Sequence, residues 1–261
     1  MARIAGDSTH YTFVVLSSEG RPVVETAFRL PSVTHIIKAV MGGGWGPGSY
    51  RGFKLGIQSQ HPRTDEQKIE ELYTKAKRGP WDPNAKLREA RDRGVFAHWC
   101  AESKAHGYET RTYEDGVSYA LRSGNEQLGG YGRAAVGFLE DLNWAGHWEV
   151  EAVEKVVYSL KHGFAGTADL ILFDRLGIVR EVVDFKTHKP NTPEPAFFED
   201  LLQLAAYKLA WNEMYPDAPI VSTRVVVLRE DATYSTDVRR VDPAVFLDVK
   251  KIWEQMERGK H

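Results

Sequence analysis

The stretch that decides the fold runs from Gly166-Thr-Ala-Asp169 to Val182-Val-Asp-Phe-Lys-Thr187, with a short turn, Asp174-Arg-Leu-Gly177, between them. Both segments lie in runs of β-branched and aromatic residues, so we expect two neighbouring strands of one hairpin. Alternate residues of a strand share a face, so Asp184 and Lys186 point to one side while Phe185 points to the other. Burial of a carboxylate and an ammonium is costly unless they are paired or bind an ion. The pattern therefore favours a functional site over a surface ion pair.

The rest of the chain is organised around this hairpin. Period-two patterns predict strands, and these cover residues 148–160, 164–173, 178–186, 219–228 and 233–240. Apolar spacing and capping residues predict helices, and these cover residues 31–40, 64–78, 83–105, 131–142, 196–214 and 243–257. We therefore expect an α/β (α+β) fold in a single domain, residues 1–261. It would contain an N-terminal β-hairpin (1–29), a helical half (30–145) and a catalytic sheet with its helices (146–261).

Composition excludes several classes of protein. The 261 residues are 42% hydrophobic and 27% charged, as in ordinary globular proteins, and the net charge of −2 excludes a basic nucleic-acid coat. No stretch approaches 18 consecutive apolar residues and the start lacks an apolar signal core, so we expect no membrane span and a cytoplasmic location. The single cysteine, Cys100, excludes an internal disulfide and a cysteine-ligated iron–sulfur cluster.

Carboxylates on neighbouring strands predict a metal site. Adjacent strands lie about 4.8 Å apart, so Asp169 and Asp184 can converge on one hard cation. Magnesium suits such ligands, because it takes few carboxylates and also binds phosphate oxygens. Glu154 is a further candidate acid, since it is the only charge among the alternate apolar residues of segment 148–160. Its carboxylate needs a partner if that face is buried. On an edge strand the carboxylate could instead remain in water and would need no partner.

Five short motifs follow one another between residues 30 and 210. They are Leu30-Pro-Ser-Val-Thr34, Arg93-Gly-Val-Phe-Ala-His98, Gly166-x-x-Asp169, Asp184-x-Lys186 and Gln203-x-x-x-Tyr207. In this order they resemble the RecB-type branch of the PD-(D/E)XK nucleases. The first motif is similar to the start of the phage-type and mitochondrial single-strand exonucleases of that group. Ala168 stands where the name of the superfamily has proline, which is usual in the RecB-like branch.

This resemblance implies a fold, a chemistry and a set of ligands. The fold would be a restriction-endonuclease-like mixed β-sheet flanked by helices, and the chemistry would be DNA hydrolysis with one or two Mg²⁺ or Mn²⁺ ions. Asp169 and Asp184 would be metal ligands, with the backbone carbonyl of Phe185 and the ring of His98 as further ligands. Lys186 would orient or deprotonate the attacking water, and burial is expected to lower its pKa for that purpose.

Four further residues are implied as substrate contacts. Gln203 and Tyr207 are four residues apart, so they share one helical face and would contact DNA or brace the lysine. Thr187, which follows the lysine, is read either as a phosphate contact or as an ordinary edge-strand residue, and Arg93 is read as a contact to the phosphate backbone. Arg93 ends a basic segment, 75–93, that is read either as an exposed helical face or as a wall that follows phosphates. The glycine-rich segment 42–56 is read as a loop near the ligand.

The function expected from these features is that of a DNA exonuclease in recombination, repair or replication, in a bacterium or a phage-infected cell. It would act on linear DNA, single- or double-stranded, beside a partner protein of recombination or replication. One alternative is an endonuclease of the same fold, and a second is a non-catalytic module that binds DNA ends. The intact Asp184-x-Lys186 motif argues against the second. A third alternative is an unrelated metal-dependent hydrolase that acts on nucleotides.

Overall fold

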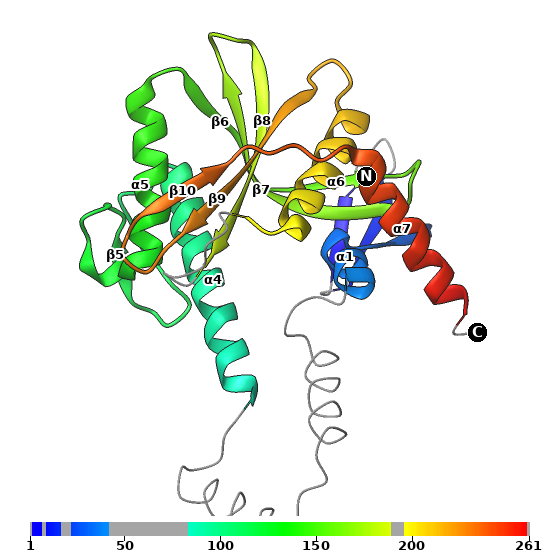
Figure 1. Cartoon of the computed structure of the whole chain (residues 1–261), viewed down its shortest axis with the longest axis horizontal. Helices are drawn as coiled ribbons and strands as arrows, with labels where there is room; N and C mark the ends of the chain where they lie inside the picture. Colours follow the sequence, from blue (N-terminus) through cyan, green and yellow to red (C-terminus); the bar gives the residue numbers. More distant parts are fainter. Residues whose placement is uncertain (1, 7–8, 17–21, 42–82, 189–195, 260–261) are drawn as a thin grey trace, which may run out of the picture.

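The computed structural model describes residues 2–6, 9–16, 22–41, 83–188 and 196–259 (Figure 1). The expected helix 64–78, the glycine-rich segment 42–56 and the first part of the basic segment 75–93 lie outside these residues. Within the described ranges, no helix is long and apolar enough to cross a membrane.

A five-stranded sheet forms the centre of the fold. Its strands are β6 (Trp148–Ser159), β7 (Phe164–Asp174), β8 (Val179–Thr187), β9 (Ile220–Leu228) and β10 (Tyr234–Asp237). They are ordered β10-β9-β8-β7-β6, and the only parallel pair among them is β8 with β9. Parallel neighbours need a crossover connection, which helix α6 (Phe198–Met214) supplies. The expected mixed sheet flanked by helices is therefore confirmed.

Helices cover both faces of the sheet (Figure 1). Helices α1 (Val33–Met41), α6 and α7 (Pro243–Arg258) lie on one face, and α4 (Pro83–Ala105) and α5 (Gly129–Ala145) lie on the other. The alternation of β8 explains the two cores, because Val182 packs in the core shared with α6, whereas Val183 and Phe185 pack in the core shared with α4 and α5. Ser32 caps α1 and Asp242 caps α7, since Ser32 Oγ accepts a hydrogen bond from the His35 N–H and Asp242 Oδ1 accepts one from the Ala244 N–H.

The first half of the chain contains more strands than expected. Strands β2 (His10–Leu16) and β3 (Pro22–Pro31) form the expected hairpin, but β1 (Ala2–Gly6) pairs with β2 and makes it a three-stranded sheet. A second small hairpin, β4 (Thr110–Thr112) with β5 (Ser118–Ala120), and a 3₁₀ turn, η1 (Glu126–Leu128), lie within the expected helical half. Strands of three residues carry too short an alternation to be read from sequence.

The N-terminal sheet packs on the start of β7. Phe13 and Leu30 form a small core with Ala165, and the Tyr11 hydroxyl lies 2.9 Å from Thr167 Oγ1. Ser32 forms a parallel bridge with Ala165. The Leu30–Thr34 motif is therefore placed against the strand that carries Gly166 and Asp169.

Strands β7 and β8 separate where the two aspartates lie. They pair with each other through residues 170–174 and 179–183. Beyond that point, β7 still pairs with β6, from Ala168 to Phe164. Strand β8 still pairs with β9, from Asp184 to Thr187. Asp169 and Asp184 are the next residues after the Leu170–Val183 pair, so both lie where the strands begin to separate.

Candidate active site

Three potential metal ligands converge at this point of the sheet. One ligand atom from each of His98, Glu154 and Asp169 lies within 4.8 Å of the other two. They come from three elements, α4, β6 and β7. Val153 and Lys155 of β6 pair with Leu170 and Ala168 of β7. Glu154 lies between them, so it is beside Asp169 on the neighbouring strand. These side chains line a small cleft, with Glu102 and Phe185 in its wall.

The backbone of Phe185 orders this cluster. Its N–H donates a hydrogen bond of 2.7 Å to Asp169 Oδ2, and its carbonyl oxygen lies 2.9 Å from His98 Nε2. A carbonyl oxygen can only accept, so Nε2 is the donor, and Nδ1 lies 3.5 Å from Asp169 Oδ2, where without a proton of its own it is an acceptor. Two acceptors that face each other at this distance are stabilised by a proton or a cation between them.

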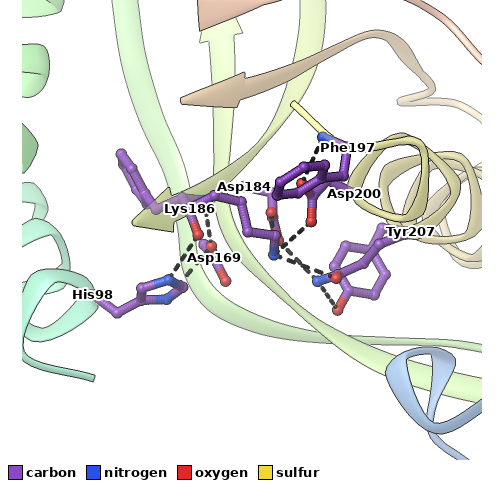
Figure 2. Close-up of polar contacts among 9 residues, drawn as sticks. His98, Asp169, Asp184, Lys186, Phe197, Asp200 and Tyr207 are labelled. Atoms are coloured by element: carbon purple, nitrogen blue, oxygen red, sulfur yellow. Dashed lines mark hydrogen bonds and ion pairs between the residues drawn. The ribbon is translucent and has the colours of Figure 1, made fainter. Parts of the chain in front are cut away.

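Asp184 lies in a second network, on the side of β8 that faces α6 (Figure 2). Its Oδ2 is 2.5 Å from Lys186 Nζ, and its Oδ1 accepts a 2.8 Å hydrogen bond from Gln203 Nε2. Gln203 Nε2 also lies 2.8 Å from the Tyr207 hydroxyl, and Gln203 Oε1 accepts from Lys186 at 3.4 Å. Gln203 therefore holds the lysine, the aspartate and the tyrosine in fixed positions relative to one another.

Burial and charge change the protonation of these groups. Burial raises the pKa of Asp184 to about 7, because desolvation and the nearby Asp169 and Asp200 outweigh the effect of Lys186. The pKa of Glu154 is likewise raised to about 7, by burial of its carboxyl group and then by Asp169. Burial alone would lower the pKa of Lys186, but Asp184, Asp200 and Asp169 raise it above its ordinary value. The expected depressed pKa of Lys186 is therefore wrong, and the side chain is an ammonium at neutral pH.

A glycine allows Tyr207 to reach this network. A Cβ at Gly166 would lie 2.3 Å from Tyr207 Cε1, so the tyrosine ring lies directly against the backbone of β7. Tyr207 is buried, with 3% of its surface exposed, which leaves the ring little room to move. This contact gives the glycine of the Gly166-x-x-Asp169 motif its physical reason.

The strand β6 departs from the expected pattern. Its register with β7 shifts between Val150 and Ala152, and Glu154 has a positive φ of 46°, which is uncommon for a residue with a side chain. The prediction of one uninterrupted apolar face on this segment is wrong, because a bulge and a left-handed residue break the alternation. Glu154 is exposed on an edge strand, yet its carboxyl group faces Asp169.

Two of the proposed substrate contacts lie on the other side of β8. Thr187 is beside Lys186 in sequence, so it points to the opposite face, where its Oγ1 approaches Gly94 of α4. The guanidinium of Arg93 lies 4.9 Å from the centre of the Tyr131 ring of α5, and its buried Nε has no hydrogen-bond partner among the described residues.

Asp200 is a site residue that the sequence analysis missed. Its Oδ1 lies 3.9 Å from Lys186 Nζ, and its Oδ2 accepts a 3.0 Å hydrogen bond from the Phe197 N–H at the start of α6. It stands three residues before Gln203, so the two share a helical face. That spacing was the signal that could have identified it.

The residues present fit a divalent cation. Carboxylates, a histidine nitrogen and a backbone carbonyl are the ligand types that Mg²⁺ and Mn²⁺ accept. Asp184 Oδ2 is buried, and the polar group beside it among the described residues is the Lys186 ammonium, at 2.5 Å. A buried carboxylate oxygen with unused lone pairs, next to the cluster of His98, Glu154 and Asp169, matches a site that is completed by a cation.

Comparisons with known proteins bear on this site. No curated protein matches the chain. Among solved structures, that of the protein SSO0001 is similar over 46% of this chain, with 16% sequence identity and a TM-score of 0.32, and the chain spans 56% of that protein's length. The family model of the PD-(D/E)XK nuclease superfamily matches residues 67–260, which include every residue of both networks. The chain therefore belongs to the PD-(D/E)XK nuclease superfamily.

Proposed function

We propose that this protein is a Mg²⁺- or Mn²⁺-dependent exonuclease that hydrolyses linear DNA during recombination, repair or replication. The observations that support the proposal are that Asp169 and Asp184 directly follow the last β7–β8 pair, Leu170 with Val183, and that the half-buried ammonium of Lys186 lies 2.5 Å from Asp184 Oδ2. Its place of action would be the cytoplasm of a bacterium or a phage-infected cell. A recombination or replication protein is the partner class that fits this role.

Different residues of the site would bind the cation and position the attacking water. Asp169, Asp184, the Phe185 carbonyl and His98 would hold the cation, with Glu154 as an additional acid. A divalent ion bound there would lower the pKa of a bound water and neutralise charge on the phosphate. Lys186, which its acidic neighbours keep protonated, would donate a hydrogen bond to the attacking water or to a phosphate oxygen.

The surrounding residues support these groups without touching the phosphate. Gln203 fixes the distance between Lys186 and Asp184 through its two hydrogen bonds, and Tyr207 fixes Gln203. Restricting these side chains before the substrate arrives lowers the cost of ordering them during the reaction. Thr187 and Arg93, on the α4 side of β8, are proposed as contacts to more distant phosphates.

The choice of exonuclease over endonuclease rests on the N-terminal motif. The segment Leu30–Thr34 resembles the start of single-strand exonucleases, and it lies against β7 through the bridge of Ser32 with Ala165. Ala165 is adjacent to Gly166, so this segment is close to one end of the site. A surface at that position would limit how far a strand extends past the scissile phosphate.

The test compares linear DNA with a covalently closed circle of the same sequence. Wild type with Mg²⁺ or Mn²⁺ should release nucleotides from the linear DNA only, and EDTA should abolish the release. Asp184→Asn should reduce the rate on the order of 100-fold or more, since even outer-shell partners of a metal cost 10- to 100-fold. Asp248→Asn, which changes a side chain 69% exposed on α7, is the matched control and should act as wild type.

Each alternative outcome assigns a different function. Equal activity of wild type and Asp184→Asn would overturn the proposed site. Cleavage of the closed circle would identify an endonuclease, and binding of DNA ends without cleavage would identify a binding module. Hydrolysis of mononucleotides without action on DNA would identify a nucleotide hydrolase.

A further inference from the structure

The face of β8 that carries the site continues one step past Lys186. Asp184, Lys186 and His188 alternate along one side of the chain, and the His188 N–H donates a 3.1 Å hydrogen bond to the Leu228 carbonyl, which extends the pairing with β9. The facing residues of α6 follow a helical spacing. Tyr207 and Gln203 lie near Asp184, Asp200 lies near Lys186, and Phe197 lies on His188.

Phe197 ends this series at the surface. Its ring centre is 4.8 Å from that of His188, at an angle of 38° between the rings, and His188 beneath it is buried. Phe197 itself remains 49% exposed, and its neighbour Phe198 is 47% exposed. Two exposed aromatic side chains next to an ionised site leave apolar surface in water, which folding normally minimises.

Phe197 is also held in place. Its N–H donates to Asp200 Oδ2, and the other oxygen of Asp200 faces Lys186. Figure 2 shows Phe197 and Asp200 together on the α6 side of Lys186, opposite His98. The backbone of Phe197 is thus tied to Asp200, and its ring packs on His188, which lies two residues beyond Lys186, or about 6.6 Å along the strand direction.

We propose that Phe197 is a substrate-positioning residue whose ring stacks on an unpaired nucleobase next to the scissile phosphate. This inference rests on the proposed function and adds that the strand is unpaired where it enters the site. A flat apolar ring beside a phosphate-binding centre matches a nucleotide, which offers a base and a phosphate within one unit. Every base has a face for stacking, so the contact would not select a sequence. A protein partner or a second copy of the chain is the competing occupant.

The test measures binding of a fluorescent single strand of about 12 nucleotides with Ca²⁺ in place of Mg²⁺, so that a cation occupies the carboxylate site, and a gel establishes that the strand stays intact. Phe197→Ala should weaken binding by about 5- to 150-fold, the range for loss of one base–aromatic stack, and Phe197→Trp should restore it. Trp144→Ala removes an aromatic side chain that is 92% exposed on α5, and it should bind as wild type. Thermal melting of each variant establishes that it is folded.

A strand with one abasic site, moved along its length, separates stacking from other effects. At one position, the abasic site should weaken binding by wild type as much as Phe197→Ala weakens binding of the intact strand. Phe197→Ala should bind the strand with that abasic site as well as it binds the intact strand. An equal abasic penalty in wild type and Phe197→Ala would overturn the proposal. So would unchanged binding by Phe197→Ala, and a change of oligomeric mass in that variant would then assign the ring to a protein contact.

Failure of the proposed function has a different signature from failure of this inference. A wild type that neither binds nor cleaves DNA refutes both. A wild type that cleaves linear DNA with Mg²⁺, with Phe197→Ala indistinguishable from it in every binding assay, refutes only the role of Phe197.

Discussion

Replacement of Gly166 by alanine tests how closely Tyr207 lies against β7. The added Cβ would be 2.3 Å from Tyr207 Cε1, 3.1 Å from Cδ1 and 3.2 Å from Cζ. Carbon atoms in contact lie about 3.5 to 4.0 Å apart, so the ring or the strand must move by about 1.2 Å. Gly166 is not among the described glycines with a positive φ, so the cost comes from the clash and not from the backbone.

The size of the effect follows from the packing. Extra atoms in a packed core cost about 1–3 kcal/mol, whereas the entropic gain of Gly→Ala is about 0.4–1 kcal/mol. We expect Gly166→Ala to lower the free energy of unfolding, with a drop in melting temperature of about 2 to 12 °C for the clash alone. The movement of Tyr207 would also disturb its contact with Gln203, so nuclease activity should fall as well.

The matched control is a glycine with free space around it. A Cβ at Gly137 of α5 would meet no atom within 4 Å, so Gly137→Ala should stabilise the protein by about 0.5–1 kcal/mol. Urea unfolding followed by circular dichroism measures both variants against wild type. A Gly166→Ala protein as stable as wild type would refute the close approach of Tyr207 to the strand. Tyr207→Phe keeps the ring and removes the hydroxyl. Its free energy of unfolding should therefore fall by about 0.5–1.5 kcal/mol, the contribution of one hydrogen bond, while the packing of the ring is kept.

Three further predictions concern charge and metal binding. Asp184 and Glu154 have pKa values raised from about 4 to about 7, so the folded protein holds more protons than the unfolded chain between these values. The metal-free protein should therefore lose stability as pH rises from 4 to 7. Mn²⁺, which displaces these protons, should raise the melting temperature more at pH 8 than at pH 5.5. An equal rise at both pH values would contradict the assignment of Asp184 and Glu154 as protonated metal ligands. Lys186→Gln should lower single-turnover cleavage of linear DNA on the order of 100-fold at every pH, because it removes a permanent positive charge, and recovery at high pH would count against that role. His98→Ala should weaken Mn²⁺ binding by about 10- to 100-fold in calorimetry. His147→Ala, which changes a half-buried histidine outside the cluster of His98, Glu154 and Asp169, should leave it unchanged.

The regular elements of the catalytic half could be predicted from the sequence. Segments 164–173 and 178–186 agree within one residue with β7 and β8, because uninterrupted alternation and a short turn leave one register. The same alternation placed Asp184 and Lys186 on one face, and the structure confirms this. The sequence order of the motifs also identified the superfamily.

Other features depend on contacts that have no local signal. Glu154 was assigned to a face by counting alternate residues, and a bulge before it invalidates such a count. Asp200 was missed because its role depends on where the start of α6 meets the end of β8. The pKa of Lys186 was predicted in the wrong direction because burial was considered without the carboxylates of neighbouring elements. Local patterns predict elements, whereas charge networks depend on the packing between them.

The charge balance of the site explains why a cation would control substrate binding. The carboxyl groups of Asp169, Asp184 and Asp200 act on the ammonium of Lys186, and the carboxyl group of Glu154 lies near that of Asp169. In the ionised state this excess of negative charge repels a DNA phosphate, and it adds to burial, the larger cause, in raising the pKa values of Asp184 and Glu154. Bound divalent ions would offset the excess and displace the protons held by the buried carboxyl groups. The groups that make the metal-free site unfavourable for DNA are therefore the ones that would make the metal-loaded site specific for a phosphate.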